Sequence, residues 1–337
     1  MTARAPRGGY RVPAPSPDAL VRWPDAFGTR FTLFVDTEEE FDWRAPLSRA
    51  ARSVEALAAL PEAHRRFRAA GAPVTYMVDH PVVTAPRAAD LLRGVLAEGG
   101  AAVGTQLHPW VNPPFGDGEE AANGFPGRLP RGAEAAKLDT LTAAIERAFG
   151  VRPRAYRAGR YGIGPATLEL LAERGYRLDT SVRARYDYAQ AGGPDFSAVG
   201  NAAFRAGPGG AVVELPLTTL FTGRWRGQGG RLHRWAGTMP RGRGLLARLG
   251  LLARVALTPE DMPLADALEA LRVGVGEGVR VLNFSFHSPT LAPGYTPYTR
   301  DAADLARFWR WWDAVLAELA RLGVRAASLD EVIAAAG

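Results

Sequence analysis

The chain has 337 residues, of which 47% are hydrophobic and 23% are charged. These fractions are typical of a globular protein and exclude a wholly disordered chain. The absence of cysteine excludes disulfides, thiolate metal sites and a cysteine nucleophile. No apolar run approaches the roughly 18–20 residues that a membrane-spanning helix needs.

The formal net charge is +6, and all but one of the 41 basic residues are arginine, because Lys137 is the only lysine. With abundant Ala, Gly and Pro, this composition is typical of a GC-rich coding bias. No motif interleaves the basic residues with stacking aromatic side chains, so we expect no nucleic acid partner. The N-terminus lacks the apolar segment of a signal peptide, which favours a cytoplasmic protein.

Short apolar runs alternate with helical patterns along the whole chain. The expected strands are residues 31–35, 73–78, 101–107, 154–157, 177–182, 212–217, 281–286 and a short 326–329. The expected helices are residues 54–70, 88–98, 134–149, 165–174, 264–273 and 302–322. This alternation predicts parallel strands joined by helices, that is, an α/β fold. The number of units favours a distorted (β/α) barrel of about seven strands.

The chain shows neither an internal repeat nor a linker after residue 28. We therefore expect a flexible Pro-rich tail over residues 1–27 and a single catalytic domain over residues 28–337. Within that domain, residues 223–260 form an Arg/Gly-rich insertion, in which Leu245–Val255 resembles a short amphipathic helix. We interpret the insertion as a lid, with a cover for an anionic substrate or a contact with a membrane as the alternatives.

Polar residues follow the expected strands where each one ends, and in barrels of this kind chemistry gathers at those ends. The first strand is followed by an acidic run over residues 36–42, in which Asp36 and Glu38 point to the same side of an extended chain. Two such carboxylates can serve as a base and a metal ligand. A solvated acidic loop is the alternative interpretation.

The second strand is followed by Asp79 and His80, and the third ends in Gln106 and His108, which share a face. A single histidine is more often structural than a ligand. The position of His108 directly after a strand, with Pro and Trp110 following, favours a functional role.

The fourth strand ends in Arg157, whose guanidinium can hold a carboxylate through two hydrogen bonds. The segment 159–164 after it has neither of the spacings of a phosphate-binding loop. The late strand 281–286 is followed by His287. His64 and His233 have no such position, and we expect both on the surface. No serine lies in a nucleophile elbow, which argues against a Ser-His-Asp hydrolase.

In this order, the motifs resemble the polysaccharide deacetylase family with its NodB-homology domain, and most closely its divergent WalW-like branch. The resemblance covers about residues 28–335. The segment around Asp36 is similar to the family's first motif, and Gly104–Trp110 to the second, metal-binding histidine motif. RAYRAGRYG is similar to the third motif, and FSFHSP to the last.

The resemblance implies hydrolysis of an N-acyl, most simply N-acetyl, amide. It implies that Asp36 is the general base, that Arg157 positions this base, and that His287 is the general acid. It also implies a divalent metal, with zinc as the expectation, bound by Glu38 and His108.

Two departures from the family pattern bear on the metal. The second acid of the first motif comes one residue later, as Glu38, and the second motif has one histidine instead of two. The third metal ligand is therefore expected from Gln106 or His80, with Asp36 and Asp79 as further sources.

The expected substrate is an acylated carbohydrate or a related small polar molecule. We expect Trp110 and Tyr161 to be stacking platforms for a sugar ring, or else plain core aromatics, and Asp79 to be a further substrate contact. Two other functions remain open. A metal-free hydrolase of a non-sugar amide, as in allantoinase-like relatives, is favoured by the missing histidine. The other is a non-catalytic carbohydrate-binding relative.

Overall fold

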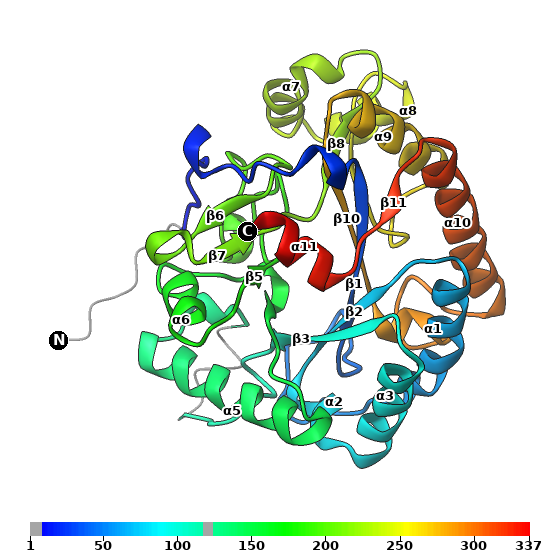
Figure 1. Ribbon diagram of the computed structural model, residues 1–337. Helices are drawn as coiled ribbons and strands as arrows, with labels where there is room; N and C mark the ends of the chain where they lie inside the picture. Colours follow the sequence, from blue (N-terminus) through cyan, green and yellow to red (C-terminus); the bar gives the residue numbers. More distant parts are fainter. Residues whose placement is uncertain (1–8, 117–123) are drawn as a thin grey trace.

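The computed structural model describes residues 9–116 and 124–337, and its centre is one curled sheet (Figure 1). The strands lie in the order β10 (Val281–His287), β1 (Arg30–Thr37), β2 (Val74–Val78), β3 (Ala101–Leu107), β4 (Ala155–Ala158), β5 (Leu178–Asp179), β7 (Val212–Glu214) and β6 (Phe204–Ala206). A short β11 (Arg325–Ala326) also pairs with β1. Neighbouring strands are parallel except β6 and β7. The sheet is an open half-barrel, which confirms the α/β class and the distorted barrel architecture without closure.

Helices cover the outer side of the sheet, with α1, α3 and α10 on one flank and α5 and α6 on the other (Figure 1). Their bounds are α1 (Leu60–Ala69), α2 (His80–Thr84), α3 (Pro86–Glu98), α5 (Arg131–Phe149), α6 (Thr167–Glu173), α9 (Leu264–Gly276), α10 (Ala302–Arg321) and α11 (Leu329–Ala336). Between β8 (Thr219–Thr222) and β9 (Ala253–Ala256), which form a separate antiparallel pair, lie α7 (Gly229–Ala236) and α8 (Gly242–Arg248). None of the helices in the described residues is long and apolar enough to cross a membrane.

The core lies between the sheet and these helices. Residues 33–35 of β1 are all buried, as expected for a parallel strand that is covered on both faces. On the helix side, the ring of Trp312 on α10 packs against Phe284 and Phe286 of β10, with ring centroids 5.6 and 5.8 Å apart. Each such side chain contributes roughly 1.5–3 kcal/mol through burial, so this contact fixes α10 against β10.

Several elements differ in their bounds from the sequence-based expectation. The strand expected over 177–182 ends at Asp179. Oδ1 of Asp179 accepts the Ser181 amide at 3.0 Å, and this local hydrogen bond competes with strand pairing. The last expected strand, over 326–329, is present but shorter: β11 ends at Ala326, and α11 begins at Leu329, where Ser328 and Glu331 form a reciprocal capping box. The helix expected over 245–255 ends at Arg248, and Gly250, with φ +62°, leads into β9.

The N-terminal residues 9–27 lie along the domain, although the sequence predicts a flexible tail there. The amide of Val12 donates to the Asp195 carbonyl at 3.0 Å, and that of Val21 donates to Ala203 at 2.9 Å. Val12 and Phe27 are buried. The segment is therefore held by backbone pairing and by two apolar side chains. The first eight residues of the expected tail lie outside the described residues.

His64 and His233 are buried, so the expectation that both lie on the surface is wrong. His64 lies on α1, where its Nδ1 is 3.2 Å from the Tyr76 hydroxyl and its Nε2 is 3.1 Å from the Gly99 carbonyl. Because a carbonyl only accepts, Nε2 carries the proton and Nδ1 accepts from the hydroxyl. Burial lowers the pKa of His64 below its usual value near 6.5. The imidazole is thus a neutral bridge inside the fold.

The neutral bridge at His64 predicts how the variant His64→Gln changes the stability of the protein. We expect the variant to be less stable than the wild type by about 1–3 kcal/mol near pH 7.5, because glutamine cannot serve both partners. The folded protein binds the His64 proton less readily than the unfolded chain does, so the wild type loses this stability as the pH falls below about 6.5. Urea unfolding should therefore show a smaller difference near pH 5.5. A difference that stays constant with pH would contradict the neutral bridge.

Candidate active site

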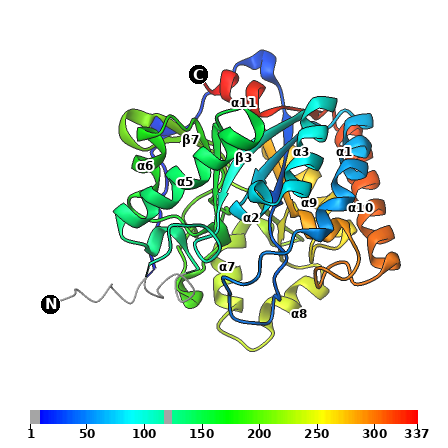
Figure 2. The same ribbon diagram turned by 90° about the horizontal axis from the view of Figure 1, so that it is seen from below.

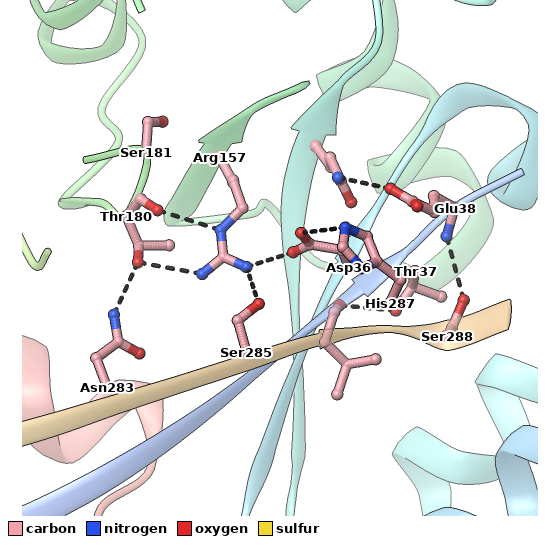
Figure 3. A network of polar contacts seen from close by, with 12 residues as sticks. Asp36, Thr37, Glu38, Arg157, Thr180, Ser181, Asn283, Ser285, His287 and Ser288 are labelled. Carbon is pink, nitrogen blue, oxygen red and sulfur yellow. Dashed lines mark hydrogen bonds and ion pairs between the residues drawn. The ribbon is translucent and has the colours of Figure 1, made fainter. Parts of the chain in front are cut away.

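The strand register brings the predicted site residues to one edge of the sheet. Asp36 of β1 lies opposite His287 of β10, and Gln106 of β3 lies opposite Arg157 of β4. Since all four strands are parallel, their carboxyl ends meet at this edge, and Figure 3 shows the side chains of Asp36, Glu38, Arg157 and His287 turned toward one another. The prediction that strand ends assemble these residues thus agrees with their placement.

Asp36 is held by a buried guanidinium (Figure 3). Nη1 of Arg157 donates to Oδ1 of Asp36 and to the Ser285 hydroxyl. Nε and Nη2 of Arg157 donate to the backbone carbonyl and hydroxyl of Thr180, at 3.1 and 3.2 Å. Arg157 is only 1% exposed, so these partners fix its plane. The other carboxylate oxygen, Oδ2, is thereby directed toward His287, whose Nε2 is 3.8 Å away.

His287 is oriented by a second carboxylate. Its Nδ1 lies 2.7 Å from Oε2 of Glu260, and its backbone amide donates to Oε1 of the same residue at 3.0 Å. A carboxylate accepts here, so Nδ1 carries a proton and Nε2 faces Asp36. Burial lowers the pKa of His287, but the carboxylates of Glu260, Glu38 and Asp36 outweigh burial and raise it to about 10. The imidazole is therefore a cation at neutral pH.

His108 is oriented in the same way from the other side. Its Nδ1 lies 2.8 Å from Oε2 of Glu39, while the Trp110 indole donates to Oε1 of Glu39 at 2.7 Å. The Trp110 ring also stacks on the imidazole, with centroids 4.3 Å apart. Nδ1 therefore donates, and Nε2 presents a lone pair toward Glu38, whose Oε2 is 3.5 Å away, and toward the Gln106 amide.

These donors fit a divalent cation. Oε1 of Glu38 and Oε1 of Gln106 are buried and have no hydrogen-bond partner among the described residues. The same two side chains reach Nε2 of His108, through Oε2 of Glu38 at 3.5 Å and Nε2 of Gln106 at 3.2 Å. Burial raises the pKa of Glu38 to about 8, against the opposing effect of the two histidines. A buried carboxylate, an unpaired amide oxygen and an imidazole whose other nitrogen is held by a carboxylate form a donor set typical of metal sites.

Two groups of acidic residues and histidine in the described residues have ligand atoms within 4.8 Å of one another. The first is Asp36, Glu38 and His287. The second consists of Glu39, Asp79 and His108. In the second, both oxygens of Glu39 already accept hydrogen bonds, so we interpret Glu39 as the support of His108.

A cavity of about 550 Å³ opens at this edge of the sheet. Of the predicted site residues, it is lined by Asp36, Glu38, Gln106, His108, Trp110, Tyr161 and His287. Trp110 is 1% exposed, which leaves its ring packed on His108. Tyr161 is half-buried and stacks on Tyr188, with centroids 5.8 Å apart. Arg157 lies behind the cavity as the support of Asp36.

Asp79 and His80 do not line this cavity. Asp79 is fully buried; its Oδ1 accepts the Val82 amide at the start of α2 and its Oδ2 accepts the Glu39 amide. Nδ1 of His80 lies 3.5 Å from the Arg52 guanidinium. The structure therefore places Asp79 as a cap of α2 and brings neither residue to Glu38.

The sequence does not predict a functional role for three further residues that contact the site. Glu39 belongs to the acidic run, but its spacing from Asp36 does not distinguish it from Glu38 or Glu40. Glu260 is the last residue of the expected Arg/Gly-rich insertion and does not end a long strand. Trp43, whose ring meets that of His287 edge-on with centroids 5.0 Å apart, comes from the loop after β1. Each role depends on a contact that only the folded chain creates.

No protein-family model matches the chain, and a search of curated proteins finds no match. Among solved structures, a Mycobacterium smegmatis protein assigned as a polysaccharide deacetylase aligns with a TM-score of 0.53 and 16% identity, over 96% of this chain and 94% of that one. The chain therefore has the α/β fold of that protein.

Two further structures show a weaker likeness. The chitin deacetylase of Colletotrichum lindemuthianum aligns with a TM-score of 0.42 and 13% identity, over 95% of this chain and 92% of that one. The 4-alpha-glucanotransferase of Thermococcus litoralis aligns with a TM-score of 0.48 and 10% identity, over 90% of this chain and 38% of that one.

The support that Glu39 gives to His108 leads to a prediction for Glu39→Gln. We expect one zinc ion to bind per chain, and we expect the variant to bind it about 10–100-fold more weakly, because an amide holds the imidazole tautomer less firmly. Competition with a chromophoric chelator measures both affinities. Glu62→Gln, an exposed acid on α1, serves as the control. Equal affinities in Glu39→Gln and the wild type would contradict the assigned role of Glu39.

Proposed function

We propose that the protein hydrolyses an N-acyl amide, most simply an N-acetyl group on a sugar or a related polar compound. The observation that carries the proposal is the pairing of Asp36, held by Arg157, with a cationic His287 across one cavity. A fixed carboxylate facing an imidazolium is the arrangement that amide hydrolysis needs from a base and an acid. The shared fold with the Mycobacterium smegmatis protein supports the same class of reaction.

In the proposed reaction Asp36 acts on the water. Its Oδ2 accepts a proton as the water oxygen bonds to the acyl carbon, while Oδ1 stays bound to Arg157. The guanidinium keeps the carboxylate from turning away, so Oδ2 remains aimed into the cavity. Positioning of this kind lowers the entropic part of the barrier.

His287 acts on the leaving group. Its Nε2 donates a proton to the amide nitrogen as the carbon–nitrogen bond breaks, so the products are a free amine and a carboxylic acid. Glu260 holds the charge and the orientation of the ring through Nδ1. The proton taken up by Asp36 returns to His287 or to solvent, which restores both groups.

We propose Glu38 and His108 as the residues that hold a divalent cation, zinc first, with Gln106 as the source of a further oxygen ligand. When bound, such a cation polarises the acyl carbonyl and acidifies water. The buried, unpaired oxygens of Glu38 and Gln106 support this assignment.

A metal-free amide hydrolase is the second candidate function. The observation that favours it is the hydrogen bond from the Gln106 amide to Oε2 of Glu38, at 2.9 Å, which ties together two of the expected ligands without a cation. Full activity after exhaustive chelation, with no metal detected by elemental mass spectrometry, would establish this candidate and remove the metal assignment.

The acid–base roles predict the behaviour of Asp36→Asn and His287→Ala. We expect each to lower kcat by about 10²–10⁴-fold, because each removes one proton transfer. Acetate or amine release from a panel of N-acylated sugars measures the rate, with Asp90→Asn, an exposed acid on α3, as the control. Both variants should retain the circular dichroism spectrum of the wild type. Wild-type turnover in both would refute the proposed mechanism.

Glu260 acts through His287, so Glu260→Gln should lower kcat and leave KM nearly unchanged. We expect kcat to fall at least 10-fold with KM within about 2-fold, because the side chain orients the acid and does not bind substrate. Asp261→Asn is the matched control, since it removes the neighbouring charge at a left-handed position, φ +61°, that Asn tolerates. A change confined to KM, or equal effects in the two variants, would refute the positioning role of Glu260.

A further inference from the structure

The segment between β8 and β9, residues 223–252, forms a protruding unit that we call the α7–α8 insertion. It stands beyond the end of the sheet in Figure 1, and in Figure 2 it lies on the side opposite α11, as does the loop after β1. It contains α7 and α8, and its ends are held together by the antiparallel pairing of β8 and β9. The insertion is thus attached to the domain through one hairpin.

Apolar side chains are exposed on this insertion to a degree not found elsewhere in the described residues. Of their seven exposed large hydrophobic side chains, five belong to the insertion: Trp225, Trp235, Met239, Leu245 and Leu249. The largest exposed fractions are 60% for Leu249, 59% for Leu245 and 56% for Trp235. Single exposed apolar residues are ordinary, but a group on one small unit marks an interaction surface.

The charge of the insertion is equally one-sided. Residues 224–254 hold eight of the 41 basic residues and none of the 35 acids, so the rest of the chain has 33 basic residues against 35 acids. The net positive charge of the protein therefore comes from this segment. A coding bias toward arginine would not remove acids from one segment only.

The exposed arginines of the insertion have no carboxylate partner. Seven of them are exposed: Arg224, Arg226, Arg231, Arg234, Arg241, Arg243 and Arg248. Within the described ranges, none forms an ion pair within 4.0 Å, whereas elsewhere exposed arginines such as Arg66 and Arg154 pair with aspartates. Arginines without partners, gathered on one unit, remain available for an external anion.

Helix α8 shows how the two features combine. Leu245 lies in α8 and Leu249 directly follows it, and because the Leu249 amide donates to the Leu245 carbonyl, the two leucines are one turn apart. Arg241 directly precedes the helix and Arg248 is its last residue. Leucine and tryptophan that flank arginine are typical of helices that rest in a bilayer interface. There, long arginine side chains reach outward to the phosphates while the apolar side chains enter the acyl boundary.

We propose that the α7–α8 insertion docks on the surface of an anionic lipid bilayer. Trp235, Leu245 and Leu249 enter the interface, and the arginines around them contact the headgroup phosphates. A second copy of the chain fits less well, because a two-fold contact through this surface would bring both sets of arginines together without any acid. Docking in this way turns the side that carries the loop after β1 toward the bilayer (Figure 2).

Co-sedimentation of the full chain with vesicles tests the proposal without any need for activity. We expect binding to vesicles of phosphatidylcholine with about 30% phosphatidylglycerol, little binding to phosphatidylcholine alone, and a loss of binding as salt increases. The triple variant R234Q/R241Q/R248Q should bind about 100-fold more weakly. The variant W235S/L245S/L249S should bind at least 10-fold more weakly to the same vesicles.

The control variant V151S/Y295S changes the two exposed hydrophobic residues outside the insertion and should bind as the wild type does. All variants alter exposed side chains, and unfolding midpoints should confirm that each is folded. Wild-type protein that stays in the supernatant with both vesicle types would overturn the proposal. So would light scattering that shows a lipid-free dimer lost in L245S/L249S, or tighter binding to nucleic acid than to the anionic vesicles at equal salt.

Discussion

The buried ion pair between Arg157 and Asp36 is the interaction on which the arrangement of the site depends. Burial of an ion costs several kcal/mol unless its charge and its hydrogen-bonding groups are satisfied, so the pair persists because Arg157 also donates to Thr180 and Ser285. Asp36 and Ser285 lie on the neighbouring strands β1 and β10, whereas Thr180 follows β5, which β2, β3 and β4 separate from β1. Asn283 extends the network, since its amide donates to the Thr180 hydroxyl at 2.9 Å. A polar network thus spans the interior of the half-barrel and holds Asp36 at its edge.

Each histidine of the candidate site is oriented by a glutamate carboxylate that binds its Nδ1. Glu260 holds Nδ1 of His287, and Glu39 holds Nδ1 of His108, so in each ring Nε2 faces the cavity. The surroundings then separate their roles. Three carboxylates raise the pKa of His287, which suits it to donate a proton. His108 instead lies against Glu38 and Gln106, whose unpaired oxygens suit a cation. The identity of each neighbour, rather than of the imidazole, decides the chemistry.

The parts of the fold that could be predicted from the sequence are those in which local pattern and burial agree. β1, β2, β3 and β10 are continuous apolar runs because parallel strands are covered on both faces, and α10 shows helical spacing because one face packs on β10. The ends of β1, β3, β4 and β10 are the positions from which the sequence predicts Asp36, His108, Arg157 and His287 as site residues. Glu39 and Glu260 could not be assigned, because the role of each comes from a contact across the fold. The burial of His64 likewise depends on Tyr76, which lies on another element.

The α7–α8 insertion and the candidate active site share a short connection. After β9, the chain runs from Ala256 to Glu260 in four residues, and the Leu257 carbonyl accepts the amide of Ser285 at 3.2 Å. On the other arm of the hairpin, the Thr218 amide donates to the Asn283 carbonyl at 3.2 Å. Both arms are therefore bonded to β10, the strand that carries His287. Because β10 anchors both arms at the base of the hairpin, a surface that binds the insertion also constrains which way the cavity faces.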